Sequence, residues 1–208
     1  MVLYWLCVTC LALTSISSVA YSQNRGRGRL LAIPVLVDDE SGIFLIDTGS
    51  GHSVIDHSFA RQLGLKQTGH AQVRQNYSLE DVPTVAARHF QFGNKAFSDV
   101  SFLEIDLEPV SRTLSAPLAG VLGTDFLATT YVGLLYSSST AKVAASTEDA
   151  GLPVKLRRAE NVFFVPVQIG PSVIELLLDT GTNLTAVSDA VWRLLPFSGT
   201  RGALVEGI

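Results

Sequence analysis

Cysteine and clustered positive charge are both scarce in this sequence. The 208 residues include two cysteines, Cys7 and Cys10, and both lie in the apolar N-terminal stretch. The rest of the chain therefore has no thiol for a disulfide, a redox pair or a zinc site. Its 15 basic residues are outnumbered by 19 acidic ones, and their longest cluster is the short RGRGR segment at 25–29. We therefore expect no nucleic-acid partner.

Charged side chains are also absent from positions 1–22. This apolar stretch contains the small residues Ser18, Val19 and Ala20, which are typical of the end of an export signal. It lacks basic residues at its start and is long enough to cross a bilayer, so an uncleaved membrane anchor is the alternative. The sequence thus predicts a signal peptide or an anchor over 1–22, and an exported protein that is periplasmic, extracellular or membrane-anchored.

One acidic motif is present twice. Asp47-Thr48-Gly49 and Asp179-Thr180-Gly181 each follow an aliphatic run. When the two motifs are aligned, the flanking residues also correspond without a gap: Pro34-Val35 with Pro166-Val167, Leu45 with Leu177, Ile55 with Val187, and Leu63 with Leu195. The chain is therefore predicted to hold two copies of one structural unit.

Each copy has the pattern of two strands, a turn and a short helix. In the first copy we expect a hairpin with strands over 30–38 and 42–47, and a helix over 57–63 that ends at Gly64. A further hairpin is expected around Gly93-Asn94, where two apolar strand patterns meet. Together these patterns predict an all-β fold.

The two copies differ in length. The first continues well beyond Asp47 to an apolar segment that ends at Gly123, whereas the chain ends at Ile208, before the second copy reaches a corresponding segment. Residues rich in serine, alanine and mixed charge separate the copies, which is typical of a linker. The predicted domains are a first lobe at 30–145, a linker at 146–160 and a partial second lobe at 161–208. We expect an incomplete gene product rather than a natural truncation.

The segments IDTGS, GVLGTDFL and LDTGT resemble those of the aspartic peptidases. More narrowly, the first copy is similar to the retropepsin-like domains of bacterial and retroviral proteins. The pairing of Asp-Thr-Gly-Ser with a downstream apolar-Leu-Gly is what carries this resemblance. It implies an acid-protease β-barrel lobe that is duplicated, with the second lobe incomplete. It also implies an aspartic endopeptidase that acts on peptide or protein substrates.

In this family each lobe contributes one aspartate, so the resemblance implies that Asp47 and Asp179 form a catalytic pair. Two carboxyl groups held together share one proton, because they cannot both ionise comfortably. One then activates water as a base, while the other protonates the substrate carbonyl. The resemblance also implies supporting roles: a hydrogen bond across the lobes for Thr48 and Thr180, close backbone approach for Gly49 and Gly181, and hydrogen bonds to the outer carboxylate oxygens for Ser50 and Thr182.

Other residues near the motifs have less specific interpretations. Tyr77 is a candidate flap residue that could cover substrate, with a half-buried strand tyrosine as the competing interpretation. The stretch 70–92 around it lacks the glycine that is usual near the tip of a flap. His52 and His57 are interpreted as surface or helix-capping residues, and Asp125 as the cap of a short helix.

Two alternatives stay open for the function. A chain with an incomplete second lobe could be a catalytically inactive remnant or a peptide-binding domain with the same fold. Two chains could also pair through their first lobes as a homodimer, which would put Asp47 opposite its symmetry mate. Because no metal-ligand set and no phosphate-binding loop is recognised, we expect neither a metal nor an organic cofactor.

Overall fold

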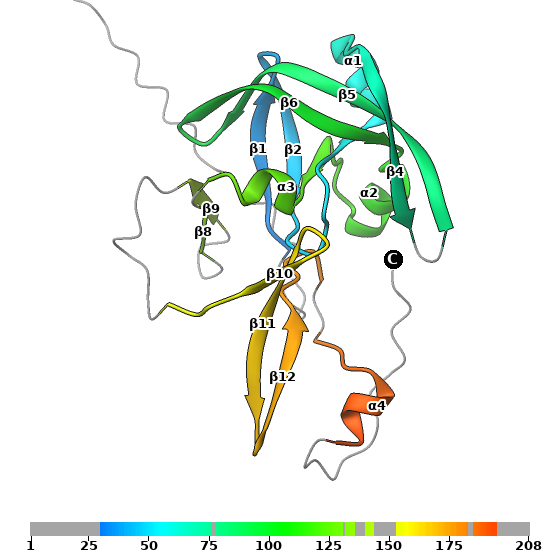
Figure 1. Cartoon of the computed structure of the whole chain (residues 1–208). Coiled ribbons are helices and arrows are strands. Elements are labelled where there is room, and N and C mark those ends of the chain that lie inside the picture. Colours follow the sequence, from blue (N-terminus) through cyan, green and yellow to red (C-terminus); the bar gives the residue numbers. More distant parts are fainter. Residues whose placement is uncertain are drawn as a thin grey trace, which may run out of the picture.

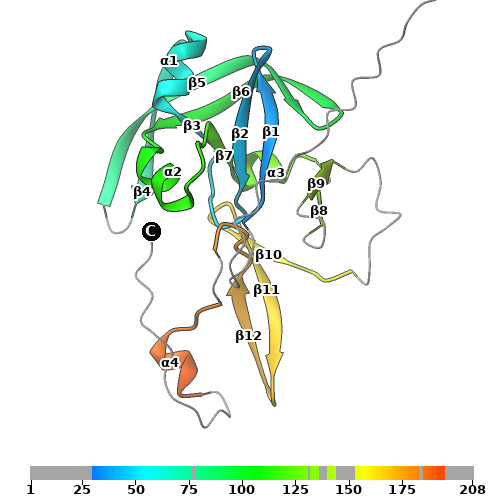
Figure 2. The same ribbon diagram turned by 180° about the vertical axis from the view of Figure 1, so that it is seen from behind.

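The structure is a computed structural model of the chain, and it contains two units (Figure 1). It describes residues 30–75, 78–130, 132–135, 140–143, 153–182 and 185–194. The predicted signal peptide, Tyr77 and residues 146–152 of the predicted linker lie outside the described residues. The first unit is a β-barrel, and the second is a small sheet that projects from one end of it, as Figures 1 and 2 show from opposite sides.

Seven strands build the first unit. They are β1 (Ala32–Val37), β2 (Glu40–Ile46), β3 (Val54–Asp56), β4 (Gln67–Gln75), β5 (Ser78–Phe92), β6 (Lys95–Ile105) and β7 (Gly120–Leu122). Their order in the sheet is β1-β2-β7-β3-β6-β5-β4. Because β1 also pairs with β5, with Val37 opposite Phe90, six strands close into a ring and β4 extends beyond it. The predicted all-β fold is confirmed.

Local sequence signals explain the helix that follows β3. The carboxylate of Asp56 accepts hydrogen bonds from the backbone N–H groups of Ser58 and Phe59 and so caps α1 (His57–Leu63). The helix ends at Gly64, whose φ of 64° is the left-handed conformation that glycine adopts without strain. Both helix limits were predicted from the sequence, and both are confirmed.

Two other helices lie in the first unit. Helix α2 (Glu108–Leu114) was not predicted, and Pro109 near its start is the signal that could have revealed it. Helix α3 (Thr124–Leu127) follows β7 directly. Both lie against the barrel in Figure 1, and α3 contributes to its core.

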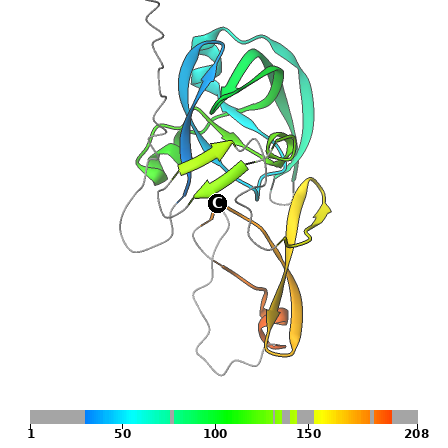
Figure 3. The ribbon, with the colours of Figure 1, turned by 90° about the vertical axis from the view of Figure 1, so that its left-hand side faces the viewer.

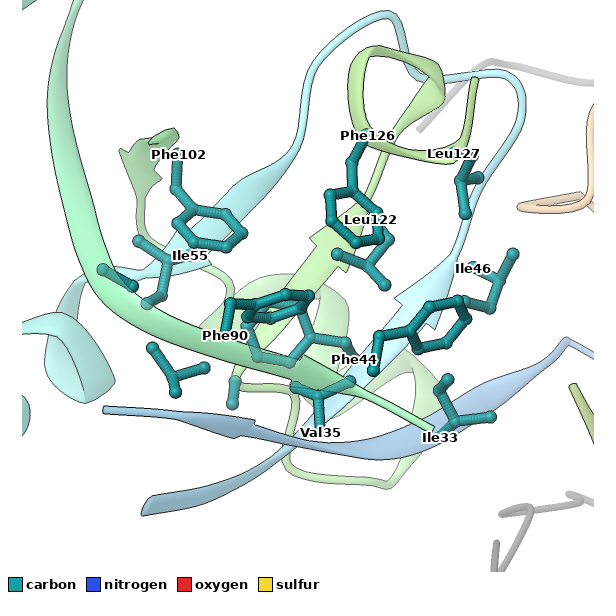
Figure 4. Close-up of a cluster of buried hydrophobic side chains, with 14 of the residues drawn as sticks. Ile33, Val35, Phe44, Ile46, Ile55, Phe90, Phe102, Leu122, Phe126 and Leu127 are labelled. Atoms are coloured by element: carbon teal, nitrogen blue, oxygen red, sulfur yellow. The ribbon is translucent and has the colours of Figure 1, made fainter. Parts of the chain in front are cut away.

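The core of the barrel is aromatic at its centre. Figure 4 shows Phe44, Phe90, Phe102 and Phe126 pointing toward one another from β2, β5, β6 and α3. The centroid of the Phe90 ring lies 5.1 Å from that of Phe126 and 5.6 Å from that of Phe102, and the rings are tilted or edge-on. Such packing adds to the hydrophobic stabilisation, since ring edges meet ring faces. This core fixes the end of β2, which leads into the first acidic motif, and the end of β7, which lies beside that motif.

Replacing Phe90 by alanine is expected to lower the free energy of unfolding by about 3–5 kcal/mol, because it leaves a cavity at the centre of the core. Val173 in the second unit is 67% exposed, so Val173→Ala is expected to change the free energy of unfolding by no more than about 0.5 kcal/mol. Urea denaturation of the two variants and the parent chain measures both effects. Equal costs for the two substitutions would contradict this assignment of the core.

The second unit repeats the hairpin of the first. Its sheet consists of β10 (Arg157–Ala159), β11 (Val162–Ile169) and β12 (Ser172–Leu177), and it is followed by α4 (Asp189–Trp192). In β1 and β2, Pro34 lies opposite Ile43; in β11 and β12, Pro166 lies opposite Glu175, which are the corresponding positions of the second copy. The predicted duplication is therefore confirmed at the level of strand pairing.

The link between the units differs in part from the prediction. A two-stranded hairpin of β8 (Val132–Leu135) and β9 (Thr140–Val143) follows the barrel. Strand β10 falls inside the predicted linker at 146–160 and pairs with β11, so that part of the prediction is wrong. The stretch is polar and has no strand periodicity, and only its pairing with β11 makes it a strand. The other domain limits stay predictions.

Within the described residues, the second unit has no buried hydrophobic core of its own. All the hydrophobic side chains that are buried lie between Leu31 and Leu127. Ile33 in β1 is 3% exposed, whereas Val165, its counterpart in β11, is only half-buried. Figure 3 shows β11 and β12 as a hairpin that extends away from the barrel. The second unit therefore depends on its junction with the first for its position.

Candidate active site

The two acidic motifs meet at the junction of the units. Asp47 follows the end of β2, and Asp179 lies shortly beyond the end of β12. A Cβ atom added to Gly49 would lie 2.5 Å from Cγ of Asp179, and one added to Gly181 would lie 2.5 Å from Cγ of Asp47. Each carboxyl group thus packs over the glycine of the opposite loop. A side chain at either glycine would clash with the aspartate of the opposite loop, so this close approach needs glycine at both positions.

Threonine side chains join the two loops symmetrically. The hydroxyl of Thr48 donates to the carbonyl of Leu178 at 2.6 Å and accepts the backbone N–H of Thr180 at 3.1 Å. In return, the hydroxyl of Thr180 donates to the carbonyl of Ile46 at 2.8 Å and accepts the backbone N–H of Thr48 at 3.0 Å. Four hydrogen bonds therefore connect the two copies of the motif, as the sequence predicted for this pair of threonines.

Backbone N–H groups surround the inner oxygens of the carboxyl groups. Oδ1 of Asp47 accepts from Gly49 N at 2.8 Å and from Ser50 N at 3.2 Å, and Oδ1 of Asp179 accepts from Gly181 N at 2.8 Å. The hydroxyl of Ser50 donates instead to the carbonyl of His52 at 2.7 Å. The role predicted for the Ser50 hydroxyl is therefore wrong, because its single proton is used within its own loop.

The role predicted for Thr182 at the outer oxygen of Asp179 stays a prediction. Its side chain is exposed at the corresponding position of the second loop.

The helix that follows the second loop is capped in the same way as the helix that follows the first. The hydroxyl of Ser188 accepts the N–H of Val191 and caps α4, just as Asp56, at the corresponding position of the first copy, caps α1.

The two carboxyl groups influence each other electrostatically. Burial, followed by the negative charge of Asp179, raises the pKa of Asp47 from 3.8 to about 6. The N–H groups of Gly49 and Ser50 act in the opposite direction, because they stabilise the ionised form. The net rise means that the pair retains one proton well above the pH at which an isolated aspartate loses it.

The loop that carries Asp47 is fastened to the segment after β7. Asp47 N donates to the carbonyl of Leu122 at 3.0 Å, and Thr124 N donates to the carbonyl of Ser50 at 2.9 Å. The carbonyl of Asn161, in the turn between β10 and β11, accepts the hydroxyl of Thr124 and so brings the second unit to the same place. This segment is the apolar-Gly stretch of the sequence, and its position beside the motif explains why the two occur together.

Asp125 has a different role from the one expected. It lies inside α3, whose N-cap is Gly123, and its carboxylate accepts two hydrogen bonds from Ser53 at 2.6 and 2.9 Å. The prediction that it caps the helix is wrong, because this partner lies far away in the sequence, at the start of β3. Sequence reasoning also missed Ser53; the only available signal was an acidic residue directly after the apolar-Gly stretch.

The histidines and the surface add little to the site. His57 pairs with Glu104 at 2.5 Å beside α1, and His52 is exposed. An open hollow of about 270 Å³ lies over β6 and α3, and it is lined by neither aspartate of the pair. The described residues contain no group of acidic, histidine and cysteine side chains that could hold a metal ion, and none of their helices is long and apolar enough to cross a membrane.

A closed β-barrel whose Asp-Thr-Gly loop meets a second Asp-Thr-Gly loop has the architecture of an aspartic peptidase. Residues 33–126 match the family described as aspartyl protease. This match covers the barrel from β1 to α3, including the first acidic motif and the apolar-Gly stretch. Over these residues the resemblance to the aspartic peptidases is confirmed, and the predicted all-β barrel fold is confirmed as well.

A search of solved structures returns matches from Rickettsia conorii and Leishmania major. The retropepsin-like aspartic protease from Rickettsia conorii is 15% identical; the match covers 57% of this chain and 84% of that one, with a TM-score of 0.41. The retroviral protease-like domain of Ddi1 from Leishmania major is 10% identical; the match covers 55% of this chain and 86% of that one, with a TM-score of 0.32. A search of curated protein sequences finds no significant match.

Proposed function

We propose that this chain is an aspartic endopeptidase in which Asp47 and Asp179 hydrolyse peptide bonds in polypeptide substrates. The observation that carries the proposal is the packing of each carboxyl group over the glycine of the opposite loop. Such packing gives two facing carboxyl groups that share a proton, which is the arrangement that peptide hydrolysis by water requires. The match of the first unit to the aspartyl protease family supports the same class of reaction.

The proposed cycle begins with one proton on the pair, carried by Asp47. Burial and the neighbouring Asp179 both favour keeping this proton bound. Asp179 accepts a proton from a water molecule as the water oxygen attacks the substrate carbonyl carbon. At the same time Asp47 gives its proton to the carbonyl oxygen. The tetrahedral diol then collapses: Asp179 gives its proton to the amine nitrogen, Asp47 takes a proton from a diol hydroxyl, and the C–N bond breaks. The amine and carboxyl products form, and the pair regains its starting protonation.

The same geometry favours a pair formed within one chain over the homodimer. Asp179 lies where a symmetry mate of Asp47 would have to lie, and four threonine hydrogen bonds hold it there. A homodimer through the first units would have to displace the second unit and break these bonds. We therefore propose a monomeric enzyme, and light scattering at the assay concentration measures its mass. Activity found only in a dimeric fraction would contradict a pair formed within one chain.

Peptide hydrolysis is expected to fall as the pH rises through about 6, because the pair then loses the proton that Asp47 holds. Above this value kcat should decline roughly tenfold per pH unit. Cleavage of an unstructured protein substrate between pH 4 and pH 8 measures the profile. A rate that rises steadily from pH 6 to pH 8 would contradict the proposed pair, and peptide binding without turnover would support the alternative of a peptide-binding domain.

We further propose that the protein is exported. The support is the uncharged apolar sequence of residues 1–22, which ends in small residues. Cell fractionation and N-terminal sequencing of the mature protein test this directly. A chain that is found in the cytosol with residues 1–22 intact would contradict it.

A further inference from the structure

Asp125 forms the most extensive side-chain network near the first acidic motif. Oδ1 of Asp125 accepts the hydroxyl of Ser53 at 2.6 Å and the N–H of Phe126 at 2.7 Å, and Oδ2 accepts the N–H of Ser53 at 2.9 Å. The hydroxyl oxygen of Ser53 in turn accepts the N–H of Gly123 at 3.1 Å. Ser53 is only 1% exposed, so water cannot replace these partners. A carboxylate is the side chain that supplies two acceptor oxygens here.

This network fastens the far end of the loop that carries Asp47. The near end is held by the bond from Asp47 N to Leu122, and the middle by the bond from Thr124 N to the carbonyl of Ser50. Asp125 holds the end at Ser53, where the loop enters β3. All three anchors come from one continuous segment, residues 122–125. The position of Ser50 relative to Asp47 is therefore set by bonds on both sides of it.

The position of Ser50 matters because its N–H points at the carboxyl group of Asp47. At 3.2 Å this bond is longer than the 2.8 Å bond from Gly49, so it is the one that a small movement of the loop would break. Both N–H groups lower the pKa of Asp47, whereas burial and Asp179, the charged group that faces it from the second unit, raise it. Losing the Ser50 bond would therefore raise the pKa of Asp47 further.

We infer that Asp125 is a positioning residue for the proposed peptidase: through Ser53 it holds the loop 47–53 so that the N–H of Ser50 stays directed at the carboxyl group of Asp47. The inference rests on the proposed function for its effect on catalysis, and its geometric part stands on the network itself. Asp125 does not contact Asp47. It acts through the backbone of the loop, across Ser53 and Ser50.

The substitution Asp125→Asn tests this role with almost no change in shape. Asparagine has one acceptor oxygen, so in either orientation its NH₂ group meets a backbone N–H, that of Ser53 or that of Phe126. The matched control is Asp56→Asn. Asp56 also accepts three backbone N–H groups, at 2.9, 3.1 and 3.1 Å, but it supports α1 and the start of α2 rather than the loop of Asp47.

The first readout is the titration of Asp47, followed by the NMR shift of its carboxyl carbon in the full chain. In the parent and in Asp56→Asn the midpoint is expected near 6, and in Asp125→Asn it is expected to lie about 0.5–1 unit higher. An unchanged midpoint in Asp125→Asn, or equal changes in both variants, would overturn the inference. If Asp125→Asn does not fold, Ser53→Ala is used, with the same direction and a smaller change expected.

The second readout separates positioning from stability. In Asp125→Asn, kcat per folded molecule should fall about 10–100-fold with KM changed less than about twofold, and the alkaline limb of kcat should move with the NMR midpoint. A merely structural role would lower the melting temperature in both variants and leave kcat per folded molecule unchanged, which would also overturn the inference. If the parent chain hydrolyses nothing, the proposed function fails, whereas the titration of Asp47 still decides whether Asp125 positions the loop.

Discussion

Replacing either Asp47 or Asp179 by asparagine is expected to lower kcat for peptide hydrolysis by about 10³-fold or more. Asparagine cannot exchange a proton with water or with the substrate carbonyl, so the pair loses either its acid or its base. Its side-chain oxygen can still accept the N–H groups that surround the inner carboxyl oxygens, so the loops should keep their shape. Cleavage of an unstructured protein substrate at about pH 5 measures the loss.

The stability of Asp47→Asn provides the control for folding. Because the pKa of Asp47 is raised from 3.8 to about 6 on folding, the folded chain binds this proton more tightly than the unfolded chain does. The stability that this proton contributes is present below pH 4 and is lost as the pH rises to 6. Above pH 6, the ionised carboxyl group of Asp47 lowers the free energy of unfolding by up to about 3 kcal/mol. Asp47→Asn is therefore expected to be more stable than the parent at pH 7 and to show no such gain at pH 4.

Urea denaturation at the two pH values measures this difference. A variant that is inactive yet more stable at pH 7 cannot owe its inactivity to unfolding. Loss of activity in Asp47→Asn alone, with Asp179→Asn fully active, would instead favour a homodimer that pairs Asp47 with its mate. Full activity in both variants would refute an aspartate mechanism altogether.

Replacing Thr180 by valine is expected to abolish most of the activity by releasing the second unit. Valine has nearly the same shape, but it leaves the carbonyl of Ile46 and the N–H of Thr48 without their partner, in a place where Thr180 is 8% exposed. Each unpaired buried group costs about 1–3 kcal/mol. Because the described part of the second unit has no hydrophobic core, the junction has little else with which to offset that cost.

Thr180→Ser is the matched control, since serine keeps the hydroxyl and removes one methyl group. We expect it to retain most of the activity, while Thr180→Val loses it together with the hydrogen-exchange protection of β11 and β12. Protection of β5 and β6 in the barrel should be unaffected, because those strands belong to the aromatic core. Full activity in Thr180→Val would show that the threonine hydrogen bonds do not hold the pair together.

Short-range signals in the sequence were enough to predict some elements of the barrel. The helix after β3 could be predicted from Asp56 to Gly64, because caps and left-handed glycines act over a few residues. The β1–β2 hairpin could be predicted from its aliphatic runs. Helix α2 and strand β10 were missed for the same reason: neither has a clear periodicity of its own, and packing or pairing with a neighbour decides its structure.

The sequence by itself determined the duplication and the all-β fold, and it singled out Asp47 and Asp179 as the proposed pair, because a gapless repeat preserves both the hydrophobic pattern and the acidic motif. Only the tertiary structure decided how the copies meet. The carbonyls of Ile46 and Leu178 receive the threonine hydroxyls, and Asp125 binds Ser53 from a distant part of the sequence. Backbone carbonyls have no residue-type signature, and partners that are distant in sequence become neighbours only when the barrel closes. The two short motifs predict the chemistry proposed for the pair, while its geometry depends on the whole fold.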